Sequence, residues 1–353
     1  MTDTAPSPPP PPGAPGLADL VRKVTDGRHL TVAEARVAIG SFMQGEASPA
    51  LMGALLAALR TKAVVASEVA GGVLALQDAL IPVSFSDPDR LVDTAGTGGG
   101  SVTTFNISTA AALVAAGAGV RLAKHGNRSF TSRSGSADVL EALGVRIELT
   151  PERMGEILEE VGIVFMFAPL LHPAMRHVGP VRRELGMPTL MNLLGPLTNP
   201  AGARRQVVGV SDPELVPLVV DSLRELGHAR AMVVHGHPGL DEISPLGPTR
   251  VSELAGGEVR SYELDPETLG LPLHTAEGLE GGEPEDNARR IRQVLGGEDR
   301  GVARAAVLLN AAAAIYVGDA APSLSEALAA ARESLDSGAA EATLEALRVA
   351  STR

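Results

Sequence analysis

Glycine and hydroxyl residues gather between residues 93 and 109 in an arrangement that suits phosphate binding. A short apolar run ends at Asp93, the cluster Gly96-Thr97-Gly98-Gly99-Gly100 follows, and Asn106-Ile107-Ser108-Thr109 precedes an alanine-rich stretch. Glycine adopts backbone conformations that are costly for other residues. The N-terminus of a helix offers free N–H groups and the positive end of a dipole to an anion. The order of strand, glycine loop and helix therefore predicts a phosphate-sugar site.

A lysine follows the next apolar run. The chain has 30 lysine and arginine residues, but its only lysines are Lys23, Lys62 and Lys124. Lys124 begins the stretch Lys-His-Gly-Asn, and turns that follow successive parallel strands meet at one edge of a sheet. An ammonium is a compact point charge, whereas a guanidinium is a planar fork. Two interpretations stay open: Lys124 serves a ligand, or it is retained by chance.

The elements that must position these residues fall into two parts, as expected for 353 residues at roughly 150 residues per domain. Residues 1–15 are proline-rich and predict a disordered tail. Residues 16–85 predict a small all-helical domain. Its signals are a capping box from Thr31 to Glu34, the pair Ser48-Pro49 at a helix start, and apolar helical spacing after it.

After Pro88, apolar runs alternate with helical stretches, which is typical of a largely parallel, buried sheet. The fold class is therefore α/β: a large domain with a mainly parallel central sheet flanked by helices, plus the helical domain. We assign 86–181 and 203–353 to the large domain and let about 182–202 join the helical one. The expected strands are Leu91–Val92, Val120–Ala123, Val145–Leu149, Val164–Phe167, Gln206–Val210 and Ala231–Val234, with a hairpin from Val251–Leu254 and Val259–Leu264. Helices are expected to start near 151 and 212 and to cover about 283–295, 302–317, 323–336 and 338–350.

Composition excludes several classes of protein. The chain has no cysteine, so disulfides and thiolate metal sites are excluded and a reducing, cytoplasmic setting is expected. The N-terminus lacks the pattern of a signal peptide, and no apolar run is long enough to span a bilayer, so no membrane partner is expected. A net charge of -12 and the absence of tryptophan argue against a nucleic-acid partner.

Seven motifs in order resemble the anthranilate phosphoribosyltransferase family: DTAGTGGG, NIST, AKHGNRS, SGSADVLEALG, HPAM, NLLGPLTNPA and GLDEISPLG. The resemblance covers nearly everything after the proline tail. It implies the class IV phosphoribosyltransferase fold shared with pyrimidine nucleoside phosphorylases, and a homodimer. The implied reaction joins anthranilate to the ribose of phosphoribosyl pyrophosphate (PRPP), with Mg²⁺ as cofactor.

The resemblance also implies residue roles on the donor side. Mg²⁺ would be held by Ser108, Asp241 and Glu242, which agrees with its preference for one or two carboxylates plus substrate phosphates. Without the resemblance, Asp241-Glu242 would be interpreted as a solvated acidic pair. The implied PRPP contacts are Gly96, Gly99, Gly100, Thr104, Asn106, Ile107, Ser108, Thr109, Lys124, Asn127, Arg128, Ser132 and Ser136.

On the acceptor side, Arg182 is the implied partner of the anthranilate carboxylate, which a guanidinium binds through two parallel hydrogen bonds. His172 could equally be a structural histidine in a proline turn. Lys124, His125 and Arg182 are the candidate catalytic residues, but an arylamine is mostly unprotonated at neutral pH, so no strong general base is expected. The implied anthranilate contacts are Gly96, His125, Asn127, His172, Arg182 and Pro196.

Two positions depart from the family pattern. Gly100 replaces the aspartate that usually follows the glycines, which leaves one carboxylate fewer near the metal and the diphosphate. Pro188 replaces an arginine before Thr189, which affects the acceptor side. The identity of the aromatic amine is therefore less secure than that of the donor.

Three alternatives to anthranilate transfer remain. A paralogue of the same fold would use another acceptor. A nucleoside phosphorylase would need a site for free phosphate and a nucleobase pocket, for which the sequence has no dedicated motif. A non-catalytic relative that binds nucleic acid would need a basic surface stripe, which the net charge of -12 opposes.

Overall fold

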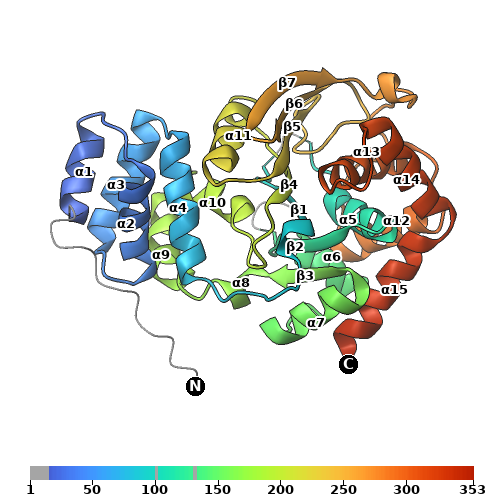
Figure 1. The fold of residues 1–353 in the computed structure, drawn as a ribbon, viewed down its shortest axis with the longest axis horizontal. Coiled ribbons are helices and arrows are strands. Elements are labelled where there is room, and N and C mark those ends of the chain that lie inside the picture. The colour runs from blue at the N-terminus through green and yellow to red at the C-terminus, as the bar shows by residue number, and fades with distance from the viewer. Residues whose placement is uncertain (1–15, 100–101, 130–132) are drawn as a thin grey trace. The chain divides into compact units, whose positions relative to one another are not determined.

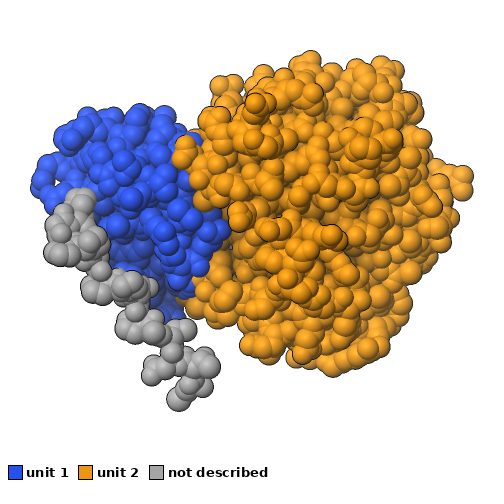
Figure 2. Space-filling view, viewed as in Figure 1, with its two compact units in different colours: residues 1–79, 174–194 blue, residues 80–173, 195–353 orange. Residues whose placement is uncertain are grey.

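A computed structural model describes residues 16–99, 102–129 and 133–353, and the chain divides into two compact units (Figure 2). The helical unit takes in residues 1–79 and 174–194, and the α/β unit takes in 80–173 and 195–353. The second segment of the helical unit thus begins and ends earlier in the chain than the expected 182–202. The predicted disordered tail lies outside the described residues.

The helical unit has the helices that its capping signals predict. Thr31 accepts a hydrogen bond from the backbone N–H of Glu34, whose side chain accepts one from the Thr31 backbone, and this capping box is the predicted one. Ser48 caps the next helix before Pro49. A Cβ on Gly71 would lie 2.4 Å from the carbonyl oxygen of Val32, so two helices touch there without a side chain between them. The helices are α1 (Leu17–Thr25), α2 (Val32–Met43), α3 (Pro49–Lys62), α4 (Ala66–Ala79) and α9 (Met175–Leu185), and α10 (Met191–Leu197) begins in this unit.

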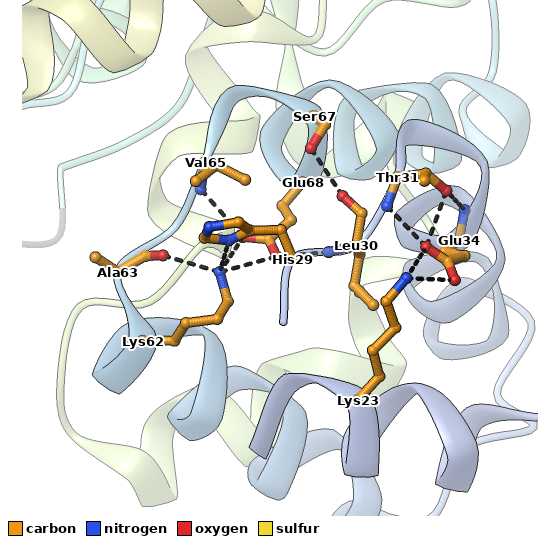
Figure 3. Close-up of polar contacts among 10 residues, drawn as sticks. All are labelled: Lys23, His29, Leu30, Thr31, Glu34, Lys62, Ala63, Val65, Ser67 and Glu68. Atoms are coloured by element: carbon orange, nitrogen blue, oxygen red, sulfur yellow. Dashed lines mark hydrogen bonds and ion pairs between the residues drawn. The ribbon is translucent and has the colours of Figure 1, made fainter. Parts of the chain in front are cut away.

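A buried ion pair lies where α3 gives way to α4 (Figure 3). The Lys62 ammonium donates to the Glu68 carboxylate at 3.0 Å and to the Ala63 carbonyl at 3.0 Å. Glu68 also accepts the backbone N–H groups of Leu30 and Val65, each at 3.0 Å. The loop before α2 is thereby tied to the first turn of α4.

The α/β unit is built on one sheet of seven strands in the order β3-β2-β1-β4-β5-β6-β7 (Figure 1). The pairs from β3 to β5 are parallel, and β6 and β7 add an antiparallel hairpin. Gly256 and Gly257 turn that hairpin with φ of 58° and 84°, which only glycine adopts at low cost. This confirms both the mainly parallel sheet and the predicted hairpin. The strands are β1 (Leu91–Gly96), β2 (Arg121–Gly126), β3 (Ile163–Phe167), β4 (Arg205–Gly209), β5 (Arg230–Gly236), β6 (Thr249–Ala255) and β7 (Glu258–Leu264).

Helices flank this sheet and complete the core. Helix α13 is apolar almost all round and nearly every residue in it is buried, as expected of a helix enclosed by protein. It packs against α5, whose apolar residues are also buried. The elements are η1 (Pro88–Arg90), α5 (Ile107–Gly117), α6 (Ser136–Ala142), α7 (Pro151–Val161), α8 (Ala168–Leu171), α11 (Leu215–Glu225), η2 (Pro266–Leu269), α12 (Pro284–Leu295), α13 (Val302–Val317), α14 (Leu324–Asp336) and α15 (Ala339–Thr352). In the described part of the chain, no helix has the length and apolarity needed to cross a membrane.

Two predicted elements differ from the structure. The expected strand Val145–Leu149 is not a strand, although Val145 and Ile147 are buried and Arg146 between them is exposed. The backbone N–H of Arg146 donates to the Ser351 hydroxyl instead of to a neighbouring strand, so the strand predicted from this apolar run is wrong. The helix expected near 212 begins at Leu215, because Asp212 first accepts the backbone N–H of Glu214 in a turn.

Candidate functional site

Glycines at the carboxyl ends of three strands make room for the loop that carries Asp241 and Glu242. A Cβ on Gly96 would lie 2.8 Å from the Asp241 carboxylate, and one on Gly209 would lie 1.7 Å from the Asp241 carbonyl oxygen. A Cβ on Gly236, at the end of β5, would lie 2.3 Å from the Glu242 carbonyl oxygen. These glycines therefore serve a close approach of backbone, in addition to any contact with a ligand.

The glycine loop and the start of α5 both face this acidic pair. Gly98 and Gly99 have φ of 66° and 78°. The N–H of Gly98 donates to the Asp241 carboxylate at 2.9 Å, and the N–H of Ser108 donates to the Glu242 carboxylate at 3.1 Å. The backbone donors at a helix N-terminus and a glycine loop are the groups expected to bind an anion. The structure thus brings the predicted donor and metal residues together across more than 130 positions of sequence.

Lys124 lies in the centre of this group, on β2. It is 3% exposed, and its ammonium donates to the Thr94 carbonyl at 2.6 Å, the Thr94 hydroxyl at 3.2 Å and the Ser108 hydroxyl at 3.3 Å. Burial lowers the pKa of Lys124, while the charges of Asp93 and Glu242 oppose that shift. The lysine therefore points at the predicted phosphate and metal positions, and its direct partners are neutral oxygens.

The acidic pair has the chemistry of a magnesium site. Burial, and then the neighbouring Asp241 charge, raises the pKa of Glu242 to about 8, and burial also raises the pKa of Asp241. A small cavity is lined by Ser108, Glu242, Thr94 and Asn310. All of these offer oxygen ligands, and a bound cation would remove the cost of two adjacent carboxylates. In the described residues, no three His, Asp or Glu side chains form a metal-holding group.

Two neutral histidines meet beside the lysine. The Nε2 atoms of His125 and His172 are 3.2 Å apart, and their ring centroids are 5.0 Å apart. Burial, and then the proximity of His172, lowers the pKa of His125 to about 3, and burial lowers that of His172 to about 4. Both rings are therefore uncharged at neutral pH, with one donating and the other accepting. His172 is thus a hydrogen-bond partner of His125, and this contact is compatible with either a structural role or a role in acceptor binding.

The other predicted donor residues lie around the same edge, with three qualifications. Arg128 is exposed and bound to Asp138 at 2.9 Å and Glu141 at 2.5 Å, and these carboxylates raise its pKa. The Ile107 side chain is fully buried in the core, so only its backbone could face a ligand. Gly100 and Ser132 lie outside the described residues. The remaining residues are Thr104 and Asn106 before or at the start of α5, Thr109 within it, Asn127 after β2 and Ser136 at the start of α6.

Comparison with known proteins agrees with this geometry. Residues 88–341 match the model of the glycosyl transferase family a/b domain, and residues 18–80 match the helical bundle domain of that family. The anthranilate phosphoribosyltransferase of Rubrobacter xylanophilus is 53% identical over 93% of this chain and 96% of its own length. The chain belongs to the anthranilate phosphoribosyltransferase family.

Solved structures of this phosphoribosyltransferase family support the fold. The crystal structure of the Thermus thermophilus enzyme has a TM-score of 0.90 and 46% identity, covering 95% of this chain and 100% of that one. The Saccharomyces cerevisiae enzyme in complex with PRPP and Mg has a TM-score of 0.85 and 28% identity, covering 95% and 98%.

The residues that the resemblance assigns to the acceptor belong to different units of the chain. Arg182 lies on α9 in the helical unit, whereas His125, Asn127 and His172 belong to the α/β unit. Pro196 lies within α10, where its carbonyl accepts from Gln206 at 3.1 Å. At the departure from the family pattern, the backbone carbonyl of Pro188 accepts a hydrogen bond from Arg60 of α3, a bond that does not depend on the residue type at position 188.

A buried polar network around Asp93, which bonds to the backbone of His125, was not predicted from the sequence. Asp93 is fully buried, accepts the N–H of His125 at 3.2 Å and accepts the amides of Asn199 at 2.9 Å and Gln206 at 3.3 Å. Burial raises its pKa. The available signal was an acidic residue inside an apolar strand, because such a side chain is costly to bury without partners.

Proposed function

We propose that this chain transfers the phosphoribosyl group of PRPP to the amine of anthranilate, giving N-(5-phosphoribosyl)anthranilate and pyrophosphate in tryptophan biosynthesis. The observation that carries the proposal is the convergence of Lys124, the Gly98 N–H, the N-terminus of α5 and the Asp241-Glu242 pair at one sheet edge. A site for an anionic donor needs positive charge, backbone donors and metal ligands together, and all three are present there.

On the donor side, we assign Lys124 to the departing pyrophosphate. Its ammonium is desolvated and bonded only to neutral oxygens of Thr94 and Ser108 among the described residues, so it can stabilise negative charge that develops as the C1–O bond breaks. Ser108, Asp241 and Glu242 would hold Mg²⁺, which supplies further neutralisation of the pyrophosphate.

On the acceptor side, the chain positions a neutral amine. The N–C1 bond forms as the C1–O bond breaks, and the amine proton leaves to solvent. His125 and His172 are neutral and hydrogen-bonded to each other, so they can shape the acceptor pocket without charge. We assign Arg182 to the anthranilate carboxylate, for which a guanidinium is the matching partner. Alignment of amine and ribose, rather than a general base, is then the main contribution of this half.

The direct test mixes the protein with PRPP, Mg²⁺ and anthranilate and follows the loss of anthranilate fluorescence. We expect turnover that depends on all three components, together with one pyrophosphate released per anthranilate consumed. Absence of turnover with anthranilate, combined with pyrophosphate release in the presence of another aromatic amine, would contradict the acceptor assignment and favour a paralogue of the same fold.

We also propose that the protein is a cytoplasmic homodimer. The family resemblance supports the dimer, and the cysteine-free sequence suits a reducing compartment. Light scattering on the purified chain should give twice the monomer mass of 36.2 kDa. A monomer mass across micromolar concentrations would contradict the dimer.

A further inference from the structure

A chain of hydrogen bonds links helix α12 to residues 103–106, the segment before α5 that we call the donor loop. The backbone N–H of Gly282 donates to Asn287 Oδ1 at 2.8 Å, and Asn287 Nδ2 donates to Asn106 Oδ1 at 2.9 Å. Asn106 Nδ2 then donates to the Ser134 carbonyl at 3.1 Å. Asn287 is 3% exposed and lies 181 positions after Asn106, so it is a buried polar residue with a specific partner in the site.

Both ends of this chain are backbone groups, and they fix the direction of every bond in it. A backbone N–H can only donate, so the oxygen of the Asn287 amide must face Gly282 and its nitrogen must face Asn106. A backbone carbonyl can only accept, so the nitrogen of the Asn106 amide must face Ser134. Reversing either amide would set two donors or two acceptors against each other. Asn106 Oδ1 also accepts the Ser134 hydroxyl at 3.2 Å, so Asn287 and Ser134 together hold the Asn106 side chain in one orientation.

The segment before Asn287 also holds the backbone of the donor loop. The N–H of Phe105 donates to the Leu279 carbonyl at 3.2 Å, and the N–H of Gly281 donates to the Thr103 carbonyl at 3.1 Å. A Cβ on Gly281 would lie 2.3 Å from the Thr104 carbonyl oxygen, so backbone packs directly on backbone. We call residues 279–287 the brace. It supports residues 103–106, which lead into the N-terminus of α5.

We propose that Asn287 is a positioning residue of the donor site: together with Ser134 it holds the Asn106 side chain in one orientation for phosphate binding, while itself touching no substrate. The inference rests on the proposed function, because Asn106 contacts the donor only if the chain uses PRPP. A buried amide whose bonds are all satisfied resists reorientation, since turning it would leave buried donors or acceptors unpaired. The brace thus supplies preorganisation that would otherwise be paid for when the donor binds.

The test is a double-mutant cycle on PRPP affinity, measured calorimetrically with Mg²⁺ on the full chain. The variants are Asn287→Ala, Asn106→Ala and the double variant. We expect Asn287→Ala to raise the Kd for PRPP about tenfold, the size expected from one lost hydrogen bond of this kind. If Asn287 acts through Asn106, the double variant should bind no more weakly than Asn106→Ala alone. The KM for anthranilate should stay unchanged.

Ser334→Ala is the matched control. Ser334 is 3% exposed and donates to the Val114 carbonyl at 2.8 Å, so it also bonds to α5, but far from the helix N-terminus. This variant loses a buried hydrogen bond of similar kind and should bind PRPP as the wild type does. Asn287→Ser, which is too short to span the same contacts, serves as a second variant if Asn287→Ala fails to fold.

The outcomes separate the inference from the proposed function. A wild-type chain that neither binds nor turns over PRPP contradicts the function. A wild-type chain that binds PRPP while the Asn287 variants bind equally well contradicts the positioning role. Independent losses that multiply in the double variant, or an equal loss in Ser334→Ala, also contradict it, because both would indicate a general effect on the fold.

Discussion

Two of the three lysines are buried, one in each unit, and their surroundings differ in kind. The Lys62 side chain is 6% exposed and is paired with Glu68, whose side chain has no exposed surface. Lys124 is 3% exposed as a residue, and its bonds go to a carbonyl and two hydroxyls. Lys62 is thus paired with a full negative charge, whereas Lys124 bonds to oxygens that carry only partial negative charges.

The positive charge of Lys62 is therefore structural, whereas the positive charge of Lys124 is available to a ligand. At Lys62, the carboxylate neutralises the ammonium, and the remaining capacity of Glu68 is used by Leu30 and Val65 (Figure 3). At Lys124, the carboxylates of Asp93 and Glu242 act through space without a direct bond among the described residues, and desolvation lowers the pKa. A buried charge without its own counter-ion is costly, and the natural way to recover that cost is an anionic ligand.

The largest expected effect is on catalysis, from Lys124→Met. Losing one preorganised donor to a developing negative charge costs about 10²–10³-fold in rate, and Lys124 carries a full charge, so we expect kcat/KM to fall by about 10³-fold. Stability should change little, because the lysine satisfies no buried carboxylate directly. Steady-state kinetics and a thermal melt check both statements. A variant that unfolds, or one with nearly normal turnover, would contradict the distinction.

Lys62→Met should do the reverse. Removing one partner of a buried ion pair leaves Glu68 charged and uncompensated, at a cost of about 3–5 kcal/mol in free energy of unfolding. The folded variant should keep its kcat/KM within about twofold, since Lys62 is not one of the proposed substrate-binding residues. Urea unfolding measures the stability.

The matched control for Lys62→Met is the double variant with Glu68→Gln. It removes both charges and should recover part of the stability, because no buried charge is left without a partner. The recovery is partial, since Leu30 and Val65 donate to different oxygens of Glu68 and the amide keeps only one of them. Equal destabilisation in the single and double variants would mean that the stranded carboxylate is not the cause.

Much of the fold could be predicted from the sequence because its signals are local. The capping box at Thr31, the glycine pair at Gly256 and the apolar runs of the parallel strands each depend on a few neighbouring residues. The signals behind the proposed donor side are also local: the glycine loop follows β1, the hydroxyl residues begin α5, and Lys124 lies within β2 near its carboxyl end. The wrong prediction of a strand at Val145–Leu149 shows where such local signals fail, because an apolar run does not reveal whether a neighbouring strand is there to pair with it.

The rest of the site depends on partners that are distant in sequence. Nothing near Asn287 indicates that it will meet Asn106, and nothing near Asp93 indicates that Asn199 and Gln206 will satisfy it. The same is true of the two buried lysine side chains: only the fold shows that Lys62 bonds to a carboxylate and Lys124 to neutral oxygens. A polar residue inside an apolar run indicates that some partner exists, but only the fold shows which one.

His228 of the α/β unit is a buried titratable side chain that, like Lys124, has a neutral hydrogen-bond partner. His228 is 8% exposed and bonds to Gln206 at 3.0 Å, and burial lowers its pKa to about 4 from the ordinary 6.5. The unfolded chain therefore takes up this proton at higher pH than the folded chain. The contribution of His228 to stability is complete above about pH 6.5 and is lost as pH falls towards 4, at about 1.4 kcal/mol per pH unit.

The test of this pH dependence compares the wild type with His228→Gln, which cannot titrate and keeps an amide donor for Gln206. Free energies of unfolding measured from pH 7 to 4 should fall less steeply for the variant, by up to about 3 kcal/mol at the acid end. Parallel pH curves for the two proteins would show that His228 is not charged on unfolding in this range.

The smallest effect is expected from Lys23→Met, which is the internal standard for Lys62. Lys23 bonds to Glu34 at 2.7 Å, a distance similar to that of the pair Lys62–Glu68. The side chains of Lys23 and Glu34 are each 23% exposed, however. Water can replace the lost ammonium, and Glu34 keeps its place through the capping box with Thr31. We therefore expect a loss below about 1 kcal/mol in urea unfolding, several times less than for Lys62→Met. Equal losses at the two lysines would mean that contact distance, and not burial of the partner, decides what an ion pair contributes here.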